Sequence, residues 1–186
     1  MTPSIGTIAR LLVFVGLQPA KFGSKNIKRE DNFMASRSSH PALSHSDSFA
    51  SSSADLMQLV GRILIGYMFL ASGWSKVTNV AGATAYFTGL GVPNPGMMAY
   101  PVGSMELIVG FALILGLATR YAAMVGFVFV LVATAIAHRY WAYPAPAQGG
   151  QFVHFIKNLA ILGGALFVYV FGAGRFSVDA KLAKNR

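Results

Sequence analysis

A single carboxylate, Glu106, is the only acidic residue between positions 56 and 178 of this chain. It interrupts an apolar run, Pro101–Leu117, that otherwise has the composition of a membrane-spanning helix. A charged side chain at the centre of a bilayer costs about 2.5–3.5 kcal/mol on insertion scales, so it is retained where it is paired, neutralised or used. Glu106 is therefore the candidate catalytic residue, able to exchange protons, and its neighbours decide its role.

The elements that must position Glu106 are apolar stretches of about 20 residues, long enough to cross roughly 30 Å of hydrocarbon at 1.5 Å per residue. Of the 186 residues, 54% are hydrophobic and 11% charged, which is typical of an integral membrane protein. We therefore predict an all-α, polytopic membrane four-helix bundle. Its spans are expected near residues 56–75, 98–117, 121–141 and 152–172.

Depth along these spans selects a partner for Glu106. Glu106 is expected roughly 12 Å from the outer face and Lys157 roughly 8 Å from the same face. Lys157 is thus the first candidate, and Arg62, nearer the opposite face, is the second. Arg62 by itself is interpreted as a side chain that extends to the cytoplasmic headgroups.

A polar pocket in the outer leaflet follows from the same placement. Asn158 is adjacent to Lys157, and Lys76 and His138 lie at the outer ends of their spans. The predicted binding residues are Glu106, Lys157, Asn158, Lys76 and His138, with Arg62 as the alternative partner.

The net charge of +9 is distributed as expected for a membrane topology, so nucleic-acid binding is not predicted. With four spans, eleven Lys and Arg fall on one side of the membrane and Lys76, Arg139 and Lys157 on the other. Because positive residues favour the cytoplasmic side, both termini are predicted to be cytoplasmic, in a bacterial inner (plasma) membrane.

Two connections between spans have recognisable signals. Asn79 is suited to cap a short helix over residues 80–90, which Gly91–Gly96 ends. That segment is either interfacial or re-entrant on the outer side, or an ordinary surface loop. Thr119 and Arg120 leave room only for a tight turn, which makes spans two and three antiparallel neighbours.

Residues 1–54 have a different composition. Nine of the eighteen residues from Ser36 to Ser53 are serine, which favours disorder. Two alternatives stay open: a reading frame that truly starts at Met34 or Met57, and a targeting segment built around Leu11–Leu17. The predicted organisation is an extension over 1–54, a membrane domain over 55–181 and a cytoplasmic tail over 182–186.

Cysteine is absent, so redox work would need a bound cofactor, a quinone or a partner protein to carry electrons. Haem ligation by His138 and His154 is not favoured, because an interfacial histidine is usually solvated. No metal site is predicted.

Several motifs, taken in order, resemble the DoxX family of small four-helix membrane proteins. They are GRILIGYMFLASGWSK at 61–76, Glu106 with Gly110, LGLATRYAA at 115–123, His138 with Trp141, FIKNLAILGG at 155–164 and GRFSVD at 174–179. The resemblance covers residues 56–181. It implies a link to quinone-dependent oxidation of sulfur compounds or to complexes that handle oxidative or thiol stress. The residues carried over by motif are Arg62, Lys76, Glu106, Lys157 and Asn158.

Three functions compete at this point. The first is a redox-associated subunit, working with a partner oxidoreductase, whose pocket holds a quinone or a small sulfur compound. The second is a non-enzymatic scaffold that anchors a partner complex, with the Glu106 pair joining helices inside the bilayer. The third is a transporter, which four spans could form only as a homo-oligomer.

Overall fold

The computed structural model describes residues 41–185, and it divides the chain into two compact units, Met1–Ser51 and Ser52–Arg186. The helices are α3 (Pro41–Thr78), α4 (Val80–Gly89), α5 (Pro95–Leu115), α6 (Thr119–Ala137), a 3-10 turn η1 (Tyr140–Ala142), α7 (Ala145–Phe171) and α8 (Val178–Lys184). The described part of the chain contains no strand, so the all-α prediction is confirmed.

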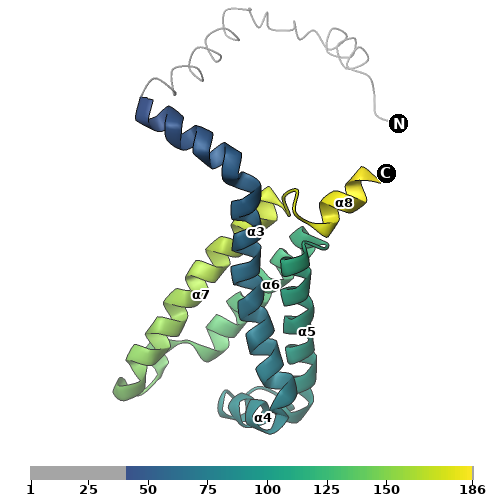
Figure 1. Cartoon of the computed structure of the whole chain (residues 1–186). Coiled ribbons are helices and arrows are strands. Elements are labelled where there is room, and N and C mark those ends of the chain that lie inside the picture. Colours follow the sequence, from purple (N-terminus) through teal and green to yellow (C-terminus); the bar gives the residue numbers. More distant parts are fainter. Residues whose placement is uncertain (1–40, 186) are drawn as a thin grey trace, which may run out of the picture. The chain divides into compact units, whose positions relative to one another are not determined.

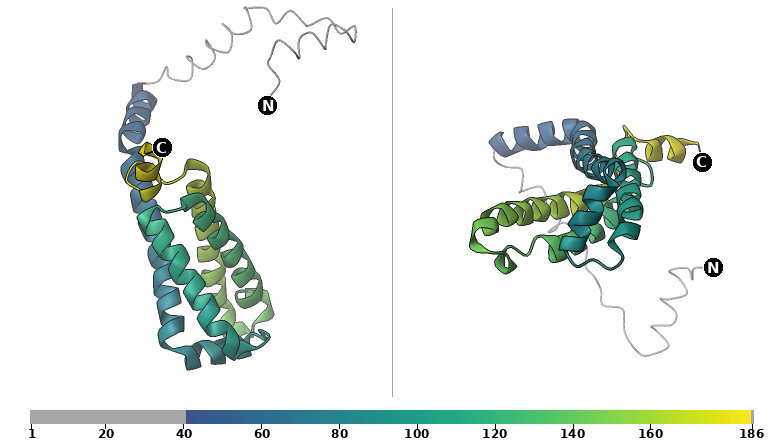
Figure 2. Two further views of the ribbon diagram at one scale, coloured as in Figure 1. Left: turned by 90° about the vertical axis from the view of Figure 1, so that its right-hand side faces the viewer. Right: turned by 90° about the horizontal axis from the view of Figure 1, so that it is seen from below.

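Four of these helices are long and apolar enough to cross a membrane: Ser46–Thr78 within α3, α5, Thr119–Ala142 and α7. Each contains or closely overlaps one of the four predicted spans. Figure 2 shows these helices side by side, and in Figure 1 α4 and α8 lie at opposite ends of the bundle.

The start of α3 differs from the sequence prediction. We expected disorder up to residue 54, whereas the helix begins at Pro41. Adding a residue to an existing helix costs far less than nucleating one, so the apolar span can extend its helix into the serine-rich segment. The other predictions for this region, Met34 as a start and Leu11–Leu17 as a targeting core, lie outside the described residues.

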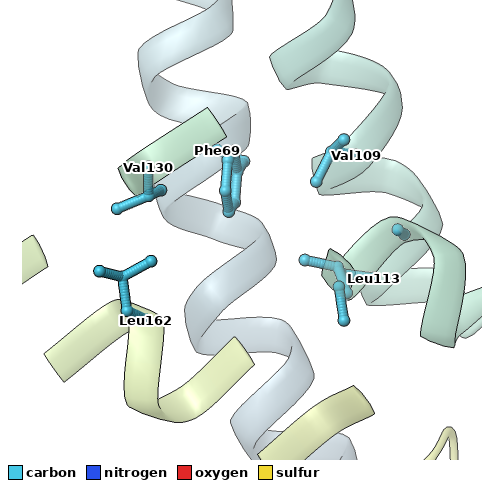
Figure 3. Close-up of a cluster of buried hydrophobic side chains, with 7 residues drawn as sticks. Phe69, Val109, Leu113, Val130 and Leu162 are labelled. Atoms are coloured by element: carbon cyan, nitrogen blue, oxygen red, sulfur yellow. The ribbon is translucent and has the colours of Figure 1, made fainter. Parts of the chain in front are cut away.

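The core of the second unit lies where α3, α5, α6 and α7 meet. Phe69 of α3 is buried against Val109 and Leu113 of α5, Val130 of α6 and Leu162 of α7 (Figure 3). The apolar side chains on the other faces of these helices are exposed, as expected for surfaces that contact lipid.

Two glycines of α3 bring its backbone against α5. A Cβ atom at Gly66 would lie 2.8 Å from the carbonyl oxygen of Gly110, and one at Gly73 would lie 2.7 Å from that of Gly103. Both distances are shorter than Cβ contacts in real proteins, so only glycine fits. The small residues of the first span therefore permit close helix packing, as predicted.

The short helix α4 forms as the sequence predicted. The Asn79 side chain accepts a hydrogen bond from the Gly82 amide at 3.0 Å, and Gly91 follows the helix with a φ of 71°. Phe87 is the buried residue of this helix. The predicted tight turn between α5 and α6 is also present, and its Gly116 and Ala118 both adopt positive φ.

Candidate functional site

The carboxylate of Glu106 is paired with Lys76. Only 3% of Glu106 is exposed, and Lys76 Nζ lies 2.8 Å from its Oε2 and 3.1 Å from its Oε1. Ser72, one turn before Lys76 on α3, connects the two groups. Its hydroxyl accepts a hydrogen bond from Lys76 at 2.7 Å and donates one to Glu106 Oε1 at 2.9 Å. The ammonium and the carboxylate together are electrically neutral.

The predicted pair of Glu106 with Lys157 was wrong. Lys157 is exposed and does not line the cavity beside Glu106. The physical reason is the direction of helical side chains, which tilt toward the N-terminus of their own helix. Lys76 stands at the end of α3, and its side chain runs back toward Ser72, one turn deeper in the bundle.

A cavity of about 460 Å³ adjoins the pair. Side chains of α3, α4, α5, α6 and α7 line it, and most of them are apolar. The aromatic ones are Phe69, Tyr86, Phe87 and Phe129. Four of the six predicted binding residues line this cavity: Lys76, Glu106, His138 and Asn158. The structure thus gathers these four residues around one cavity, and their role in binding stays a prediction.

Asn158 and His138 are held from the α6–α7 side of the cavity. Asn158 Nδ2 donates to Thr134 Oγ1 at 2.8 Å, and Thr134 in turn donates to the Val130 carbonyl at 2.6 Å. His138 Nδ1 lies 2.8 Å from Gln151 Oε1. The His138 ring also stacks on His154, with 5.0 Å between centroids.

Arg62 lies at the other end of the bundle, away from Glu106. It is fully buried, and its guanidinium donates to the carbonyls of Leu113 at 3.1 Å, Ile114 at 3.5 Å and Phe176 at 2.7 Å. The interpretation that Arg62 extends to the headgroups was therefore wrong, because the chain that follows α7 covers it. A cation against the last carbonyls of α5 is also favoured by the helix dipole.

Asp179 completes this end by capping α6. Its carboxylate accepts hydrogen bonds from the amides of Ala118 at 2.7 Å and Thr119 at 2.9 Å, and from the Thr119 hydroxyl at 2.8 Å. Burial alone would raise the pKa of Asp179, but these hydrogen bonds and the charge of Arg62 outweigh it and hold the pKa below its ordinary value. Arg62 and Asp179 thus fix the α5–α6 turn and do not take part in the cavity.

Sequence reasoning missed two polar residues near the cavity, Ser72 and Thr134. Ser72 could have been found, because it precedes Lys76 by four residues and so lies on the same face of a helix. Thr134 is buried within an apolar span, and only the packing of α6 on α7 brings it to Asn158.

No group of three or more His, Cys, Asp or Glu side chains in the described residues is arranged to hold a metal ion. What the cavity offers is an apolar volume with a neutral, hydrogen-bonded ion pair on one wall and an amide and an imidazole on another. Such an arrangement can orient a ring that carries polar groups and can exchange protons with it.

Comparison with known proteins supports the membrane assignment. The profile of the DoxX family matches residues 57–139. The inner membrane protein YqjF of Escherichia coli is 35% identical over 131 residues, which is 70% of this chain and 95% of that protein. The inner membrane protein YphA of the same organism is 29% identical over 126 residues, 68% of this chain and 90% of that protein.

A third relative carries a functional name. The Bacillus subtilis protein named "Putative oxidoreductase CatD" is 35% identical over 79 residues, which is 42% of this chain and 55% of that protein. No solved structure matches the chain.

Proposed function

Because the chain belongs to the DoxX family and is an integral membrane protein, we propose that it is a redox-associated membrane subunit whose cavity binds the ring of a quinone-class molecule. The name of the relative CatD supports a redox role. Since the chain has no cysteine, electrons would pass between the bound ring and a partner oxidoreductase.

The observation that carries the proposal is the buried pair of Lys76 and Glu106 on the wall of an otherwise apolar cavity. Ligand sites are typically apolar clefts of about 300–1,000 Å³ with a few placed polar groups, and this cavity fits that description. An aromatic ring suits walls formed by Phe69, Phe87 and Phe129.

The charge of the site favours a neutral ring over a small sulfur oxyanion. Two lysines would have suited an anion, but Lys157 is exposed outside the cavity and Lys76 is neutralised by Glu106. An anion would lose its hydration without gaining a free cation, which is unfavourable in an apolar cavity.

The same pair also supports a second candidate, a purely structural role. Lys76, Ser72 and Glu106 join α3 to α5 at the point where Gly73 and Gly103 bring the two backbones together. Polar side chains that join transmembrane helices stabilise bundles without any ligand. A scaffold of this kind would keep the cavity without binding a ring in it.

Ligand binding separates the two candidates. The full chain, in lipid nanodiscs, would be titrated by calorimetry with decylubiquinone and, under nitrogen, with decylubiquinol. We expect saturable binding of at least one form. Lys76→Met should weaken it by about tenfold or more, because the Glu106 carboxylate on the cavity wall loses the charge that compensates and positions it. Lys157→Met makes the same change on the exposed face of α7 and should bind as the wild type does. Absence of binding, or equal loss in both variants, would contradict the proposal and leave the scaffold.

A further inference from the structure

A groove and a hollow adjoin each other at the end of the bundle that carries α8 (Figure 1). The groove, of about 280 Å³, lies between α3 and α7, and most of its lining residues are apolar, among them Ile65 and Phe167. The hollow, of about 430 Å³, is formed by the α5–α6 turn and by the residues that join α7 to α8. Phe171 and Gly172 line both, so one space continues where the other ends.

Arg120 lies where the groove and the hollow meet. A Cβ atom at Gly172 would lie 3.4 Å from Arg120 Nε, so the guanidinium stands over the glycine that both spaces share. Arg120 Nη2 donates to the Val170 carbonyl at 3.3 Å, which holds the side chain in this position. No carboxylate in the described part of the chain forms an ion pair with Arg120. Its charge is therefore available to an anion.

The surroundings of the hollow are positively charged. Asp179 also lines the hollow, but its carboxylate already accepts three hydrogen bonds from the start of α6. Within residues 52–185, the other carboxylate at this end is that of Asp55, which pairs with Arg175 at 3.4 Å. Five basic residues stand against these two acidic ones: Arg62, Arg120, Arg175, Lys181 and Lys184.

The junction of the two spaces lies at the edge of the apolar spans. The fourth candidate span ends at Phe171 and the third begins at Thr119. The groove therefore runs along the part of α3 and α7 that hydrocarbon would surround, whereas the hollow lies at the level of the lipid headgroups. The predicted topology places this end on the cytoplasmic side, where anionic lipids attract basic groups.

We propose that the groove and the hollow together bind one anionic phospholipid of the cytoplasmic leaflet, with an acyl chain in the groove and the phosphate on Arg120. A guanidinium binds phosphate through short, charge-assisted hydrogen bonds, and an acyl chain suits an apolar groove. Gln58 lines the groove and touches Gly174 of the hollow, since a Cβ atom at Gly174 would collide with Gln58 Oε1. Its amide, which can donate and accept, stands at the level of the glycerol and ester groups of such a lipid.

Lipid titration of the full chain tests this proposal. The purified protein, in a nonionic detergent, would be titrated with palmitoyl-oleoyl phosphatidylglycerol or with phosphatidylcholine of the same acyl chains, and native mass spectrometry would count the bound lipid. We expect one phosphatidylglycerol to bind about fivefold tighter or more than phosphatidylcholine, roughly the gain for one arginine near an anionic lipid. Glycerol 1-phosphate, which has the phosphate but no acyl chain, should bind far more weakly.

Two variants separate the headgroup contact from the acyl-chain contact. Arg120→Gln should bring the affinity ratio of the two lipids close to one, whereas Arg139→Gln, an exposed arginine at the other end of the bundle, should keep the wild-type ratio. Gly61→Leu places a side chain in the groove, where a Cβ meets nothing within 4 Å, and should weaken both lipids. Gly163→Leu, whose Cβ is equally free and which lines neither space, should bind as the wild type does.

Equal affinity of the wild type for the two lipids would overturn the proposal, and so would equal losses in Arg120→Gln and Arg139→Gln, which would indicate diffuse attraction between charges. Tight binding of glycerol 1-phosphate, or full binding by Gly61→Leu, would overturn the place of the acyl chain. The proposed function does not depend on these results, because the cavity beside Glu106 lies at the other end of the bundle.

Discussion

At the scale of single residues, the ion pair of Lys76 and Glu106 can serve the protein in two ways. It can hold α3 against α5, and it can take part in binding a ligand in the cavity. A buried ion pair often contributes little compared with apolar residues of the same volume, because both charges lose their hydration. Breaking it by removing one partner is costly, since the other charge stays buried without compensation. The presence of this buried ion pair is therefore weak evidence that it serves stability alone.

A double-mutant cycle on this pair separates its contribution to the stability of the helix bundle from its contribution to ligand binding. Lys76→Met and Glu106→Leu alone should each destabilise the bundle by about 3–5 kcal/mol at most, and membrane reference states lower that value. The double variant should recover most of this stability, because no unpaired charge remains. Thermal unfolding in detergent would measure the stability of the wild type, the two single variants and the double variant.

Ligand binding by the double variant completes the cycle. The proposed function predicts a stable double variant that has lost the binding of decylubiquinone and decylubiquinol seen with the wild type, whereas a scaffold predicts that neither the wild type nor the double variant binds them. Simple additivity of the two single destabilisations would reject the pairing itself.

At this scale the sequence predicts how far along its span a residue lies, but it does not predict toward which side of the helix bundle the side chain points. Counting residues from the predicted span ends placed Glu106 and Lys157 at similar depths, yet Lys157 faces away from the cavity. The rotation of a helix about its axis depends on packing against its neighbours, which a nearly uniform apolar span does not encode. The clustering of Lys76, Asn158 and His138 was predictable because the expected spans placed all three toward the outer face of the membrane.

At the scale of elements, α3 and α5 are the most tightly joined pair described by the glycine geometry. The contacts at Gly66 with Gly110 and at Gly73 with Gly103 leave no space for a methyl group. The second contact lies one turn from the ion pair, since a Cβ at Gly73 would also lie 3.0 Å from Glu106 Cβ. The position of Glu106 thus depends on the spacing of the two helices.

Alanine at Gly73 should therefore force α3 and α5 apart. The expected cost is about 1–3 kcal/mol, as for other overpacked sites, with weaker ligand binding because Glu106 moves. Gly163→Ala on α7 is the matched control, because a Cβ there meets nothing within 4 Å. It should leave the melting temperature unchanged or raise it slightly, since alanine favours helix over glycine. A neutral Gly73→Ala would show that this contact does not set the helix spacing.

The span positions, the Asn79 cap and the α5–α6 turn were predictable because each depends on a local signal. The length of α3 was not, because helix can spread from an apolar span into residues that would not form it by themselves. The sequence also did not predict that residues after α7 cover Arg62, because the hydrogen bond between Arg62 and Phe176 joins parts of the chain 114 residues apart.

At the scale of the whole molecule, the distribution of lysine and arginine predicts that both ends of the chain face the cytoplasm. The loop at Tyr143–Pro144, between η1 and α7, would then lie on the opposite side. Reporters of compartment inserted in that loop and fused after Arg186 should report opposite sides. The same compartment for both would contradict an even number of spans.

Arg62 also imposes an order on the biogenesis of this protein. The guanidinium enters the membrane with the first span, but one of its carbonyl partners belongs to Phe176, 114 residues later. At roughly 5–20 residues per second, translation leaves an interval on the order of ten seconds before that partner exists. During this interval only the Leu113 and Ile114 carbonyls, once they are made, can accept hydrogen bonds from the guanidinium, and the charge of Asp179 is also still absent. Truncated chains that end before Phe176 would keep Arg62 without its third carbonyl and present it to the proteases that survey the membrane.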